Sequence, residues 1–408
     1  MSVVIRPCTK SEFGPVLRAC EAAFGRGVSE DEVRRWAPVV DSTRLLGAFV
    51  DDVPVGSAGA CALTVTVPGG LVAAAGVTMV GILPSHRRRG IFGRLMGELI
   101  RDAREHEEAI MVLWASEGGL YQRLGFGLGT RAASVDIETS HASFRHPLER
   151  AAPCRLIGLD EAASVLPPLY DAARVTTPGM LARTPSWWAA YRLGDPVHER
   201  GGGEPLQCVV FDQEEPGGFG YALYRLHPAY ERRLHRDWLE VVEAVHTSAQ
   251  SAQDLWHYLL GMDLVERVKA DFLQEDHPLT LILDEPGRLR LTLSDGLWLR
   301  LIDVRQALAA RSYAAVGTLT LEVTDTLCEW NRGCWRIEAD ETGCLVTACE
   351  GPADIQLGVE DLAAVYLGAF SFTDLRHADR LVELSDDAAT RASAIFQRSR
   401  APWCAEVI

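Results

Sequence analysis

The sequence has no long apolar run and no leader-like start. None of its apolar stretches approaches the roughly 18 residues that a membrane-spanning helix needs. Residues Met1 to Arg6 do not begin the charged and then apolar pattern of a secretory signal. We therefore expect a cytoplasmic protein without a membrane span.

The sequence has fewer basic than acidic residues. The 408 residues include 40 Lys and Arg against 56 Asp and Glu, which gives a formal net charge of -16. A nucleic-acid binder neutralises phosphates with a basic face, and the densest basic segment here, Arg87 to Arg89, is only three residues long. We expect no nucleic-acid partner, and the acidic balance favours a cationic partner such as an amine.

Cysteine pairs with metal-ligand spacing are also missing. The ten cysteines are spread along the chain, and the four between Cys328 and Cys349 include no Cys-x-x-Cys pair of the kind that binds zinc. Reduced, mostly buried thiols are the better interpretation. We expect neither a metal site nor a disulfide framework.

The chain does contain a strand, a basic turn and a helix in succession. A run of β-formers from Gly76 to Leu83 ends at Pro84, the segment His86-Arg87-Arg88-Arg89-Gly90 follows, and apolar residues then recur every four positions from Ile91. The first N–H groups of a helix have no internal partner and carry partial positive charge. The turn is therefore suited to an anion such as a pyrophosphate, and the alternative is a solvated arginine cluster on a surface helix.

These residues carry a resemblance to a known family. Arg-x-x-Gly between a strand and a helix resembles the acyl-CoA signature of the GNAT superfamily of N-acetyltransferases. Together with Ser116-Glu117-Gly118-Gly119-Leu120-Tyr121, the segment from His86 to Gly90 resembles the Eis (enhanced intracellular survival) branch. The general signature has Gly or Ala where this chain has Phe92. The resemblance is close over the first third of the chain and follows the layout of the remainder.

The length predicts two to three domains, because a single core stops growing at roughly 250–300 residues. The resemblance implies an α/β (α+β) fold with two tandem GNAT-like mixed-sheet domains, the second degenerate, and a C-terminal sterol-carrier-like domain. The implied limits are residues 1–152, 153–286 and 287–408, with the C-terminal tail returning to the active site.

Two details of this layout can be stated from the residues. The turn from Thr247 to Gln253, which follows a strand of the second domain, has no Arg cluster and no Gly, so it should not bind a pyrophosphate. In the last domain, Leu289 to Leu293 and Leu297 to Ile302 are expected to be strands around a turn at residues 294–296.

The resemblance assigns a donor site for acetyl-CoA. The strand from Leu71 to Leu83 is expected to separate from its neighbour, so that main-chain groups of Val80 and Ile82 bind the pantetheine arm. The basic turn and the first helical residues would hold the phosphates. The predicted cofactor-binding residues are Val80, Gly81, Ile82, Arg87, Arg88, Arg89, Gly90, Ile91, Phe92, Gly93, Ser116 and Glu117.

Acetyl transfer also needs an acid and a base. Tyr121 follows a short apolar strand and is predicted to protonate the departing thiolate, because a phenol of pKa about 10 suits a thiolate at neutral pH. Packing with a hydrogen-bonded hydroxyl is the alternative. For the base, the resemblance points to the terminal carboxylate of Ile408, and Glu406 and His86 are the alternatives.

The leading hypothesis is an acetyl-CoA-dependent N-acetyltransferase that acts on primary amines of cationic acceptors, which are aminoglycoside-like, polyamine-like or protein lysines. The predicted substrate-binding residues are Phe24, Trp36, Met79 and Glu406, although core packing is the alternative for the two aromatic side chains. Two other hypotheses are a lipid or sterol carrier and a non-catalytic assembly protein. The resemblance implies a homohexamer.

Overall fold

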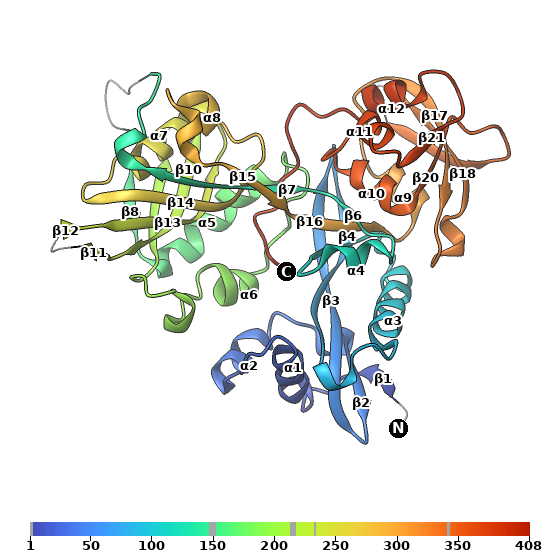
Figure 1. Cartoon of the computed structure of the whole chain (residues 1–408), viewed down its shortest axis with the longest axis horizontal. Coiled ribbons are helices and arrows are strands. Elements are labelled where there is room, and N and C mark those ends of the chain that lie inside the picture. Colours follow the sequence, from blue (N-terminus) through green and yellow to red (C-terminus); the bar gives the residue numbers. More distant parts are fainter. Residues whose placement is uncertain (1–2, 147–151, 213–217, 232–233, 341–342) are drawn as a thin grey trace. The chain divides into compact units, whose positions relative to one another are not determined.

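The computed structural model describes residues 3–146, 152–212, 218–231, 234–340 and 343–408, and Figure 1 labels its elements. Contacts divide the described chain into two units. Unit 1 contains the residues up to Thr130, the segment Leu297–Ser399 and the terminal pair Val407–Ile408. Unit 2 contains Arg131–Gly296 and Arg400–Glu406.

The first sheet, in unit 1, has seven described strands. Their order is β1 (Val4–Pro7), β2 (Leu45–Val50), β3 (Val53–Val67), β4 (Gly70–Ile82), β5 (Ile110–Trp114), β16 (Leu297–Leu301) and β6 (Gly127–Leu128). The long β3–β4 hairpin turns at Pro68-Gly69, where Gly69 has φ +77°. A Pro followed by a Gly of positive φ is the chemistry of a type II turn.

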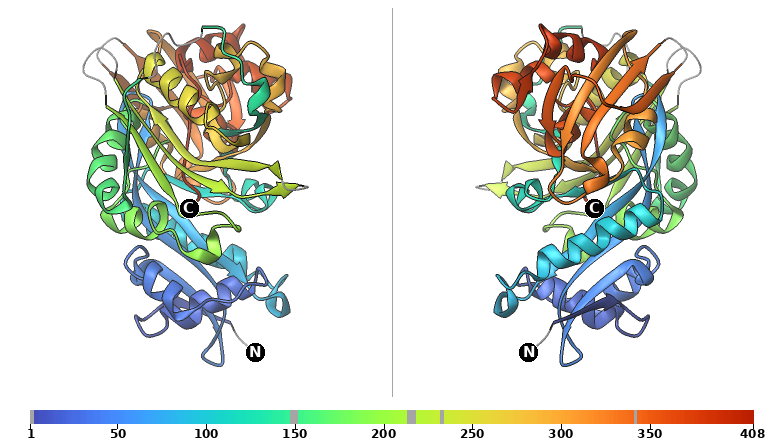
Figure 2. Two further views of the ribbon diagram at one scale, coloured as in Figure 1. Left: turned by 90° about the vertical axis from the view of Figure 1, so that its left-hand side faces the viewer. Right: turned by 90° about the vertical axis from the view of Figure 1, so that its right-hand side faces the viewer.

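Helices cover both faces of this sheet. The helix α3 (Ile91–Glu105) runs along one face of the blue strands in Figure 2 and buries Leu95 and Leu99 against Ala58 and Val77. The opposite face packs on α1 (Phe13–Ala22) and α2 (Glu30–Trp36) around Phe13. A capping box of Ser29 and Glu32 begins α2. Successive side chains of a strand point to opposite faces. The strands of this sheet therefore contribute side chains to the apolar cores on both of its faces.

The second sheet, in unit 2, also has seven described strands. Their order is β15 (Thr292–Asp295), β7 (Arg131–Glu138), β14 (Val265–Gln274), β13 (Asp237–His246), β10 (Phe219–His227), β9 (Gln207–Asp212) and β8 (Arg155–Ile157). The helices of this unit are α5 (Leu159–Arg174), α6 (Pro185–Trp187) with a π-helical turn Trp188–Arg192, α7 (Ala249–Leu260) and α8 (Leu279–Ile282). Two short strands, β11 (Tyr230–Glu231) and β12 (Leu234–His235), pair with each other.

The third sheet, in unit 1, is formed by the last hundred residues, orange to red in Figure 1. Its strands are β19 (Cys344–Cys349), β18 (Gly333–Ala339), β17 (Gly317–Thr324), β20 (Ile355–Gly358) and β21 (Leu381–Glu383). Its helices are α9 (Val304–Ala309), α10 (Val359–Tyr366), α11 (Phe372–His377) and α12 (Ala388–Phe396). The three sheets confirm the predicted mixed α/β fold.

Two predicted local features are wrong. Ser294 and Asp295 lie in a strand rather than in the predicted turn, because β15 extends to Asp295 and pairs with β7 in the second sheet, while β16 joins β5 and β6 in the first. The segment from Thr247 to Gln253 is not all turn, because Ser248 caps α7, which begins at Ala249. The domain limits at residues 152 and 286 stay predictions.

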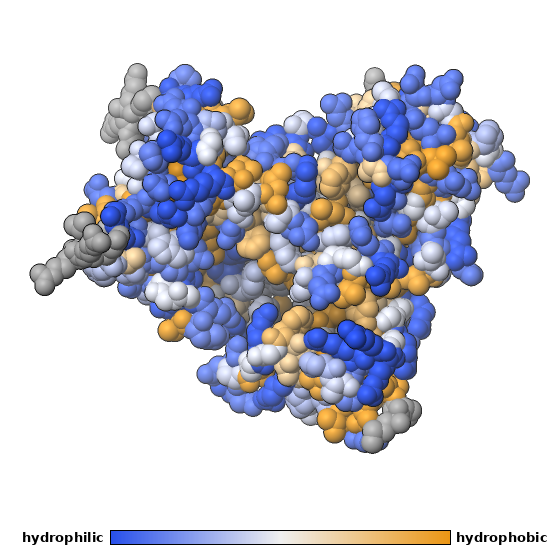
Figure 3. Space-filling view, in the orientation of Figure 1, coloured by the Kyte–Doolittle hydropathy of each residue, from blue (hydrophilic) through white to orange (hydrophobic). Residues whose placement is uncertain are grey.

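Among the described residues, no helix is both long and apolar enough to cross a membrane. Hydrophilic residues cover most of the face that Figure 3 presents, with smaller apolar patches between them.

Candidate functional site

The strand β4 leaves its neighbour β5 halfway along. The parallel pairing covers only Ala74 to Gly76 of β4, opposite Ile110 to Val112. From Val77 to Ile82, the main-chain groups on the edge of β4 that faces β5 are therefore not paired with β5. The predicted separation of this strand is confirmed, and it presents main-chain donors and acceptors to an extended ligand.

A bulge sharpens the bend of β4 at Met79. Opposite it, the pairing of β3 slips between Ser57 and Gly59, and Met79 has φ +52°, which is unusual for a residue with a side chain. The Ser57 hydroxyl donates to the Met79 carbonyl at 2.7 Å and so satisfies one of the bulged groups. Gly81 lies against α1, because a Cβ there would be 2.8 Å from the Cys20 carbonyl oxygen.

The basic turn leads into an uncapped helix. Arg88 and Gly90 both have left-handed backbones, with φ +61° and +74°. No side chain caps α3, and its first backbone bond runs from the Arg94 N–H to the Gly90 carbonyl at 3.2 Å. The three N–H groups of Ile91, Phe92 and Gly93 therefore have no acceptor within the helix and concentrate positive potential at its start.

This helix start is also open. A Cβ built on Gly90 or Gly93 would meet nothing within 4 Å. Backbone donors, the positive end of a helix and free space are what a phosphate group needs. The residues present therefore fit the diphosphate of a nucleotide-like ligand such as coenzyme A.

The three arginines of the turn differ in their contacts. Arg87 donates to the carbonyls of Ala23 and Ile82, at 2.7 and 3.1 Å, and ties the turn to the end of α1. Arg89 donates to the Ser85 carbonyl at 3.1 Å. Arg88 is exposed and has no partner among the residues that the structure describes. The guanidinium group of Arg88 is thus the one available to an anion.

Tyr121 lies beside this helix start. It belongs to α4 (Gly118–Gln122), and its ring meets Phe92 edge to face, with 5.6 Å between ring centroids. The aromatic residue that departs from the general signature, Phe92, therefore packs against the predicted acid. Tyr121 is 9% exposed. Burial, helped by the neighbouring Cys20 and Glu117, raises the pKa of Tyr121 to about 12.

The hydroxyl of Tyr121 has no hydrogen-bond partner in the described part of the chain. It remains a free donor for a ligand, and the alternative of a hydrogen-bonded packing residue is not what the structure shows. Ser116 and Glu117, at the start of the same turn, are exposed.

The residues that support α4 come from a distant part of the sequence. On β16, Trp298 packs so closely on Gly118 that a Cβ there would overlap its ring. Arg300, fully buried on the same strand, donates to the Leu124 carbonyl just after α4 and forms two bonds to Asp325, at 2.8 and 2.9 Å. Sequence reasoning missed this support. An arginine inside the apolar run Leu297 to Ile302 was the available signal, because a buried charge needs a partner.

The predicted acceptor residues are only partly gathered. Trp36 and Met79 both pack on the core cluster around Phe13, between α1, α2 and the first sheet. Phe24 is 45% exposed at the end of α1, with the Arg26 guanidinium 5.5 Å from its ring centroid. The structure thus brings together Trp36 and Met79, and it leaves Phe24 outside their cluster.

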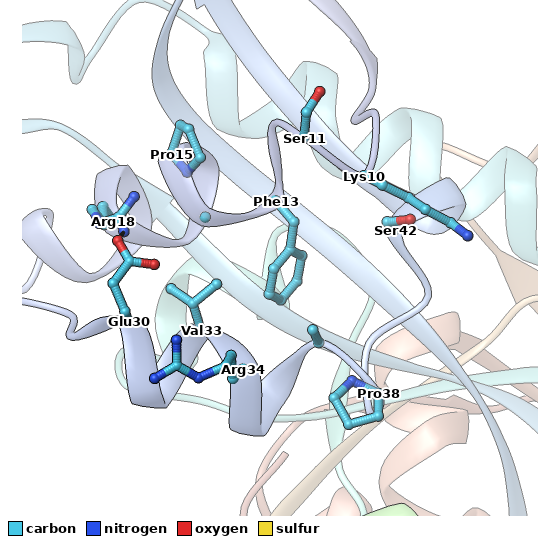
Figure 4. A pocket seen from close by; sticks show the side chains of 12 residues that line it. Lys10, Ser11, Phe13, Pro15, Arg18, Glu30, Val33, Arg34, Pro38 and Ser42 are labelled. Carbon is cyan, nitrogen blue, oxygen red and sulfur yellow. Dashed lines mark hydrogen bonds and ion pairs between the residues drawn. The ribbon is translucent and has the colours of Figure 1, made fainter.

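A cavity of about 730 Å³ is lined by residues of α1, of α2 and of the segments next to them (Figure 4). Phe13 and Val33 point into it, and the ion pair of Arg18 with Glu30 stands at its edge. Its lining residues, among those described, include none of the predicted site residues.

The C-terminal tail is largely buried. Residues Pro402 to Glu406 are buried, and Val407 and Ile408 are half-buried. The Glu406 carboxylate, 1% exposed, pairs with Arg183 and with Arg192, the latter at 2.9 Å, and also accepts from the Trp187 indole at 3.0 Å. The carboxylate oxygens of Glu406 thus already have partners within the protein. Its role in binding the acceptor stays a prediction. His86 is half-buried in the basic turn and contacts the Ser85 hydroxyl at 2.9 Å.

The second unit repeats the strand and helix without the open helix start. There β13 is followed by α7, which begins with a capping box: the Ser248 hydroxyl accepts from the Ser251 N–H, and the Ser251 hydroxyl accepts from the Ser248 N–H. With this side-chain cap and no arginine in the turn, the helix start lacks the combination found at α3.

Comparisons with known proteins agree with this architecture. Residues 4–129 and 179–301 each match a family described as an acetyltransferase (GNAT) domain, and residues 304–405 match one described as a sterol carrier protein domain. An uncharacterized N-acetyltransferase of Streptomyces avermitilis is 36% identical over 393 residues, which is 93% of each chain.

Eis proteins are among the relatives. N-acetyltransferase Eis of Mycobacterium tuberculosis is 28% identical, with 97% of each chain covered. The crystal structure of Eis1 from Mycobacterium abscessus superposes with a TM-score of 0.85 at 28% identity and covers all of both chains. The chain is therefore an N-acetyltransferase that belongs to the Eis family of the GNAT superfamily.

Proposed function

We propose that the protein transfers the acetyl group of acetyl-CoA to a primary amine of a cationic acceptor. The observation that carries this proposal is the open, uncapped start of α3 beside the free edge of β4 and the unpartnered hydroxyl of Tyr121. All three belong to unit 1. Acetyl-CoA supplies the activated thioester, and the chain supplies binding, orientation and proton handling.

The donor is held by two kinds of group. The N–H groups of Ile91 to Gly93 and the guanidinium of Arg88 bind the diphosphate, and charge-assisted bonds of this type are the strong ones. The free edge of β4 around Val80 and Ile82 binds the pantetheine arm through main-chain groups. Arg87 contributes by holding the turn rather than by touching the ligand.

Tyr121 stabilises the sulfur as it leaves. A thiol has a pKa of about 8.5, and burial raises the pKa of Tyr121 to about 12. A thiolate is therefore a weaker base than the Tyr121 phenolate, and complete proton transfer from the phenol to it is uphill. The hydroxyl acts chiefly as a hydrogen-bond donor to the developing thiolate, in the manner of an oxyanion-hole group.

The base in this proposal is the terminal carboxylate of Ile408, which removes a proton from the acceptor ammonium. A carboxylate of pKa about 3.5 in water becomes a better base when burial disfavours its charged form. The acidic balance of the chain, with a net charge of -16, attracts a cationic acceptor. The acceptor class, the homohexamer and the cytoplasmic location belong to the same proposal.

The test uses the purified full chain with acetyl-CoA and a chromogenic thiol reagent. We expect release of free CoA to rise when a polyamine, an aminoglycoside or a lysine peptide is added, and mass spectrometry to find one added acetyl group on the amine. An uncharged amine of similar size is the control. A release rate that no cationic amine changes would refute the proposal.

A further inference from the structure

Two cysteines lie directly opposite each other in the third sheet. In the antiparallel pairing of β18 with β19, Cys334 is the partner of Cys349, and both are free thiols. Opposed residues of such a pair have Cα atoms about 4.5–5.5 Å apart, and a disulfide spans Cα separations of about 4.4–6.8 Å. The register of the two strands therefore places these thiols where a single bond can join them.

The pair lies on the side of these strands that faces solvent. Ile337 and Val346 are also opposed to each other, and both are buried in the core. Each cysteine is three positions away from one of these two residues along its strand, so both thiols point to the other face. Both cysteines are only partly buried. A reagent in solution can therefore reach the two sulfur atoms.

The two thiols also influence each other. Burial, followed by hydrogen bonding to the Cys349 side chain, raises the pKa of Cys334 to about 11, and the charges of Glu322 and Asp354 act in the same direction. The Cys334 S–H thus reaches two acceptors, the Cys349 sulfur and the Gly351 carbonyl at 3.6 Å. Among the described residues, neither cysteine belongs to a group of three side chains placed to hold a metal ion.

The strand β19 can adjust to a bond between the two sulfur atoms. It is an edge strand, paired in the third sheet with β18 alone, and Cys349 is its last residue. The Cβ atoms of opposed residues are about 4.5–5.5 Å apart, whereas a disulfide needs about 3.5–4.5 Å. The strands must therefore approach by roughly 1 Å. A disulfide that is exposed and carries some strain is readily reduced again.

We propose that Cys334 and Cys349 form a reversible redox site, which a low-molecular-weight disulfide of the glutathione class oxidises to a cross-strand disulfide. The site belongs to the sterol-carrier-type domain, since residues 304–405 match that family. It is separate from the residues that bind the donor in the proposed function. The proposal stands on the register, the shared solvent face and the edge position of β19.

The oxidation proceeds by two exchanges of thiol and disulfide. Because Cys334 is protonated at neutral pH, the thiolate of Cys349 attacks first, forms a mixed disulfide with one half of the small disulfide and releases the other half as a thiol. Cys334 then gives its proton to water and attacks the Cys349 sulfur, which forms the cross-link and releases the second small thiol. Two cysteine thiols are oxidised and one small disulfide is reduced to two thiols.

The cross-link would stabilise the edge of the third sheet. It closes a loop of about 15 residues, a length at which a disulfide constrains the unfolded chain appreciably. Edge strands have unpaired main-chain groups on one side, and elements with few buried contacts open first. In a reducing compartment, such as the proposed cytoplasm, the pair is a dithiol and forms the disulfide only under oxidising conditions.

The experiment uses the full chain with Cys154→Ser and Cys344→Ser as the background. Cys154 is exposed and Cys344 lies on β19, so their removal leaves the opposed pair as the target. The single variants are Cys334→Ser and Cys349→Ser in this background. The matched control combines Cys349→Ser with Thr347→Cys, which moves the thiol two positions along the same face. Its distance to the other cysteine is then a diagonal of about 7–8 Å, too long for a disulfide.

Each protein is incubated with oxidised glutathione, freed of it and compared by intact mass, tryptic peptides and melting temperature. Trypsin cleaves after Arg336 and so separates Cys334 from Cys349. The background protein should lose the mass of two hydrogen atoms, yield the two peptides joined by a disulfide and melt about 5 °C higher. Dithiothreitol should reverse all three changes. The single variants and the matched control should carry glutathione instead of a cross-link.

Three results would overturn the proposal. A background protein that carries only glutathione adducts, or that does not react at either cysteine, would exclude the redox pair. A matched control that forms its cross-link as fast as the background would show that the register of β18 and β19 does not select the bond. A fully cross-linked protein with an unchanged melting temperature would exclude the stabilising role. None of these measurements uses turnover, so the outcome is independent of the proposed acetyl transfer.

Discussion

Replacement of Tyr121 by Phe separates stability from activity more sharply than any other change in this site. The substitution removes one oxygen and keeps the ring, whose contacts are edge-to-face with Phe92 and with Phe126 at 5.6 and 5.8 Å between centroids. Since the hydroxyl has no partner among the described residues, its removal orphans no donor or acceptor in the folded protein.

The magnitudes follow from this geometry. A buried hydroxyl without a hydrogen bond costs about 1–3 kcal/mol, and the ring is 9% exposed, so its loss should leave the free energy of unfolding unchanged or raise it by up to about 1 kcal/mol. The loss of an oxyanion-type donor costs about 10²–10³-fold in kcat, or about 2.7–4 kcal/mol of barrier. We therefore expect a slower enzyme that is at least as stable.

The assay has three parts. Single-turnover release of CoA reports the chemical step, calorimetric titration reports acetyl-CoA binding, and thermal melting reports stability. Binding should be unchanged. Burial raises the pKa of Tyr121 to about 12 and so favours the protonated form, and the parent should show no alkaline decline from this residue well below pH 12. A single-turnover rate within twofold of the parent would refute the role of Tyr121, and a clear fall in melting temperature would refute the structural reasoning.

Three further predictions concern other parts of the site. Arg88→Ala should weaken acetyl-CoA binding by about 10- to 100-fold in titration calorimetry and leave the melting temperature normal, because it removes a phosphate bond of about 1.5–3 kcal/mol. Arg87→Ala should chiefly lower the melting temperature, and the reverse pattern would contradict the assignment. Arg300→Met should lower the free energy of unfolding by about 3–5 kcal/mol in urea titration, because it removes the buried partner of the Asp325 carboxylate. Adding Asp325→Leu should not restore this stability, because that carboxylate also accepts from the backbone of Leu327 and Cys328 and from the Asn331 amide; a double variant as stable as the parent would contradict this. A C-terminal tag converts the Ile408 carboxylate to an amide and should therefore abolish turnover at an unchanged melting temperature. Removal of the tag by a protease should restore activity, and Ile408→Phe should stay active. A fully active tagged enzyme would exclude the terminal carboxylate as base.

Much of the site could be predicted because its parts are local. The strand, the basic turn and the start of α3 lie within residues 70–105, and helix starts and turns depend on neighbouring residues. The different tasks of Arg87 and Arg88 could not be predicted, because they depend on where the carbonyl of Ala23 lies in the fold. The same is true of Phe92, whose ring stands beside Tyr121 only after two helices pack together.

The sequence alone was sufficient for the family and for the absence of a basic turn in the second domain, because these follow from residue types at fixed short spacings. The tertiary structure decided which sheet receives each strand, and it placed β16 with Trp298 and Arg300 beneath α4. It also paired Glu406 with Arg183 across 223 positions of the sequence. Pairings of this kind are not encoded in local patterns, because a buried charge can be satisfied by any opposite charge that the fold brings near, and only the packed chain selects one.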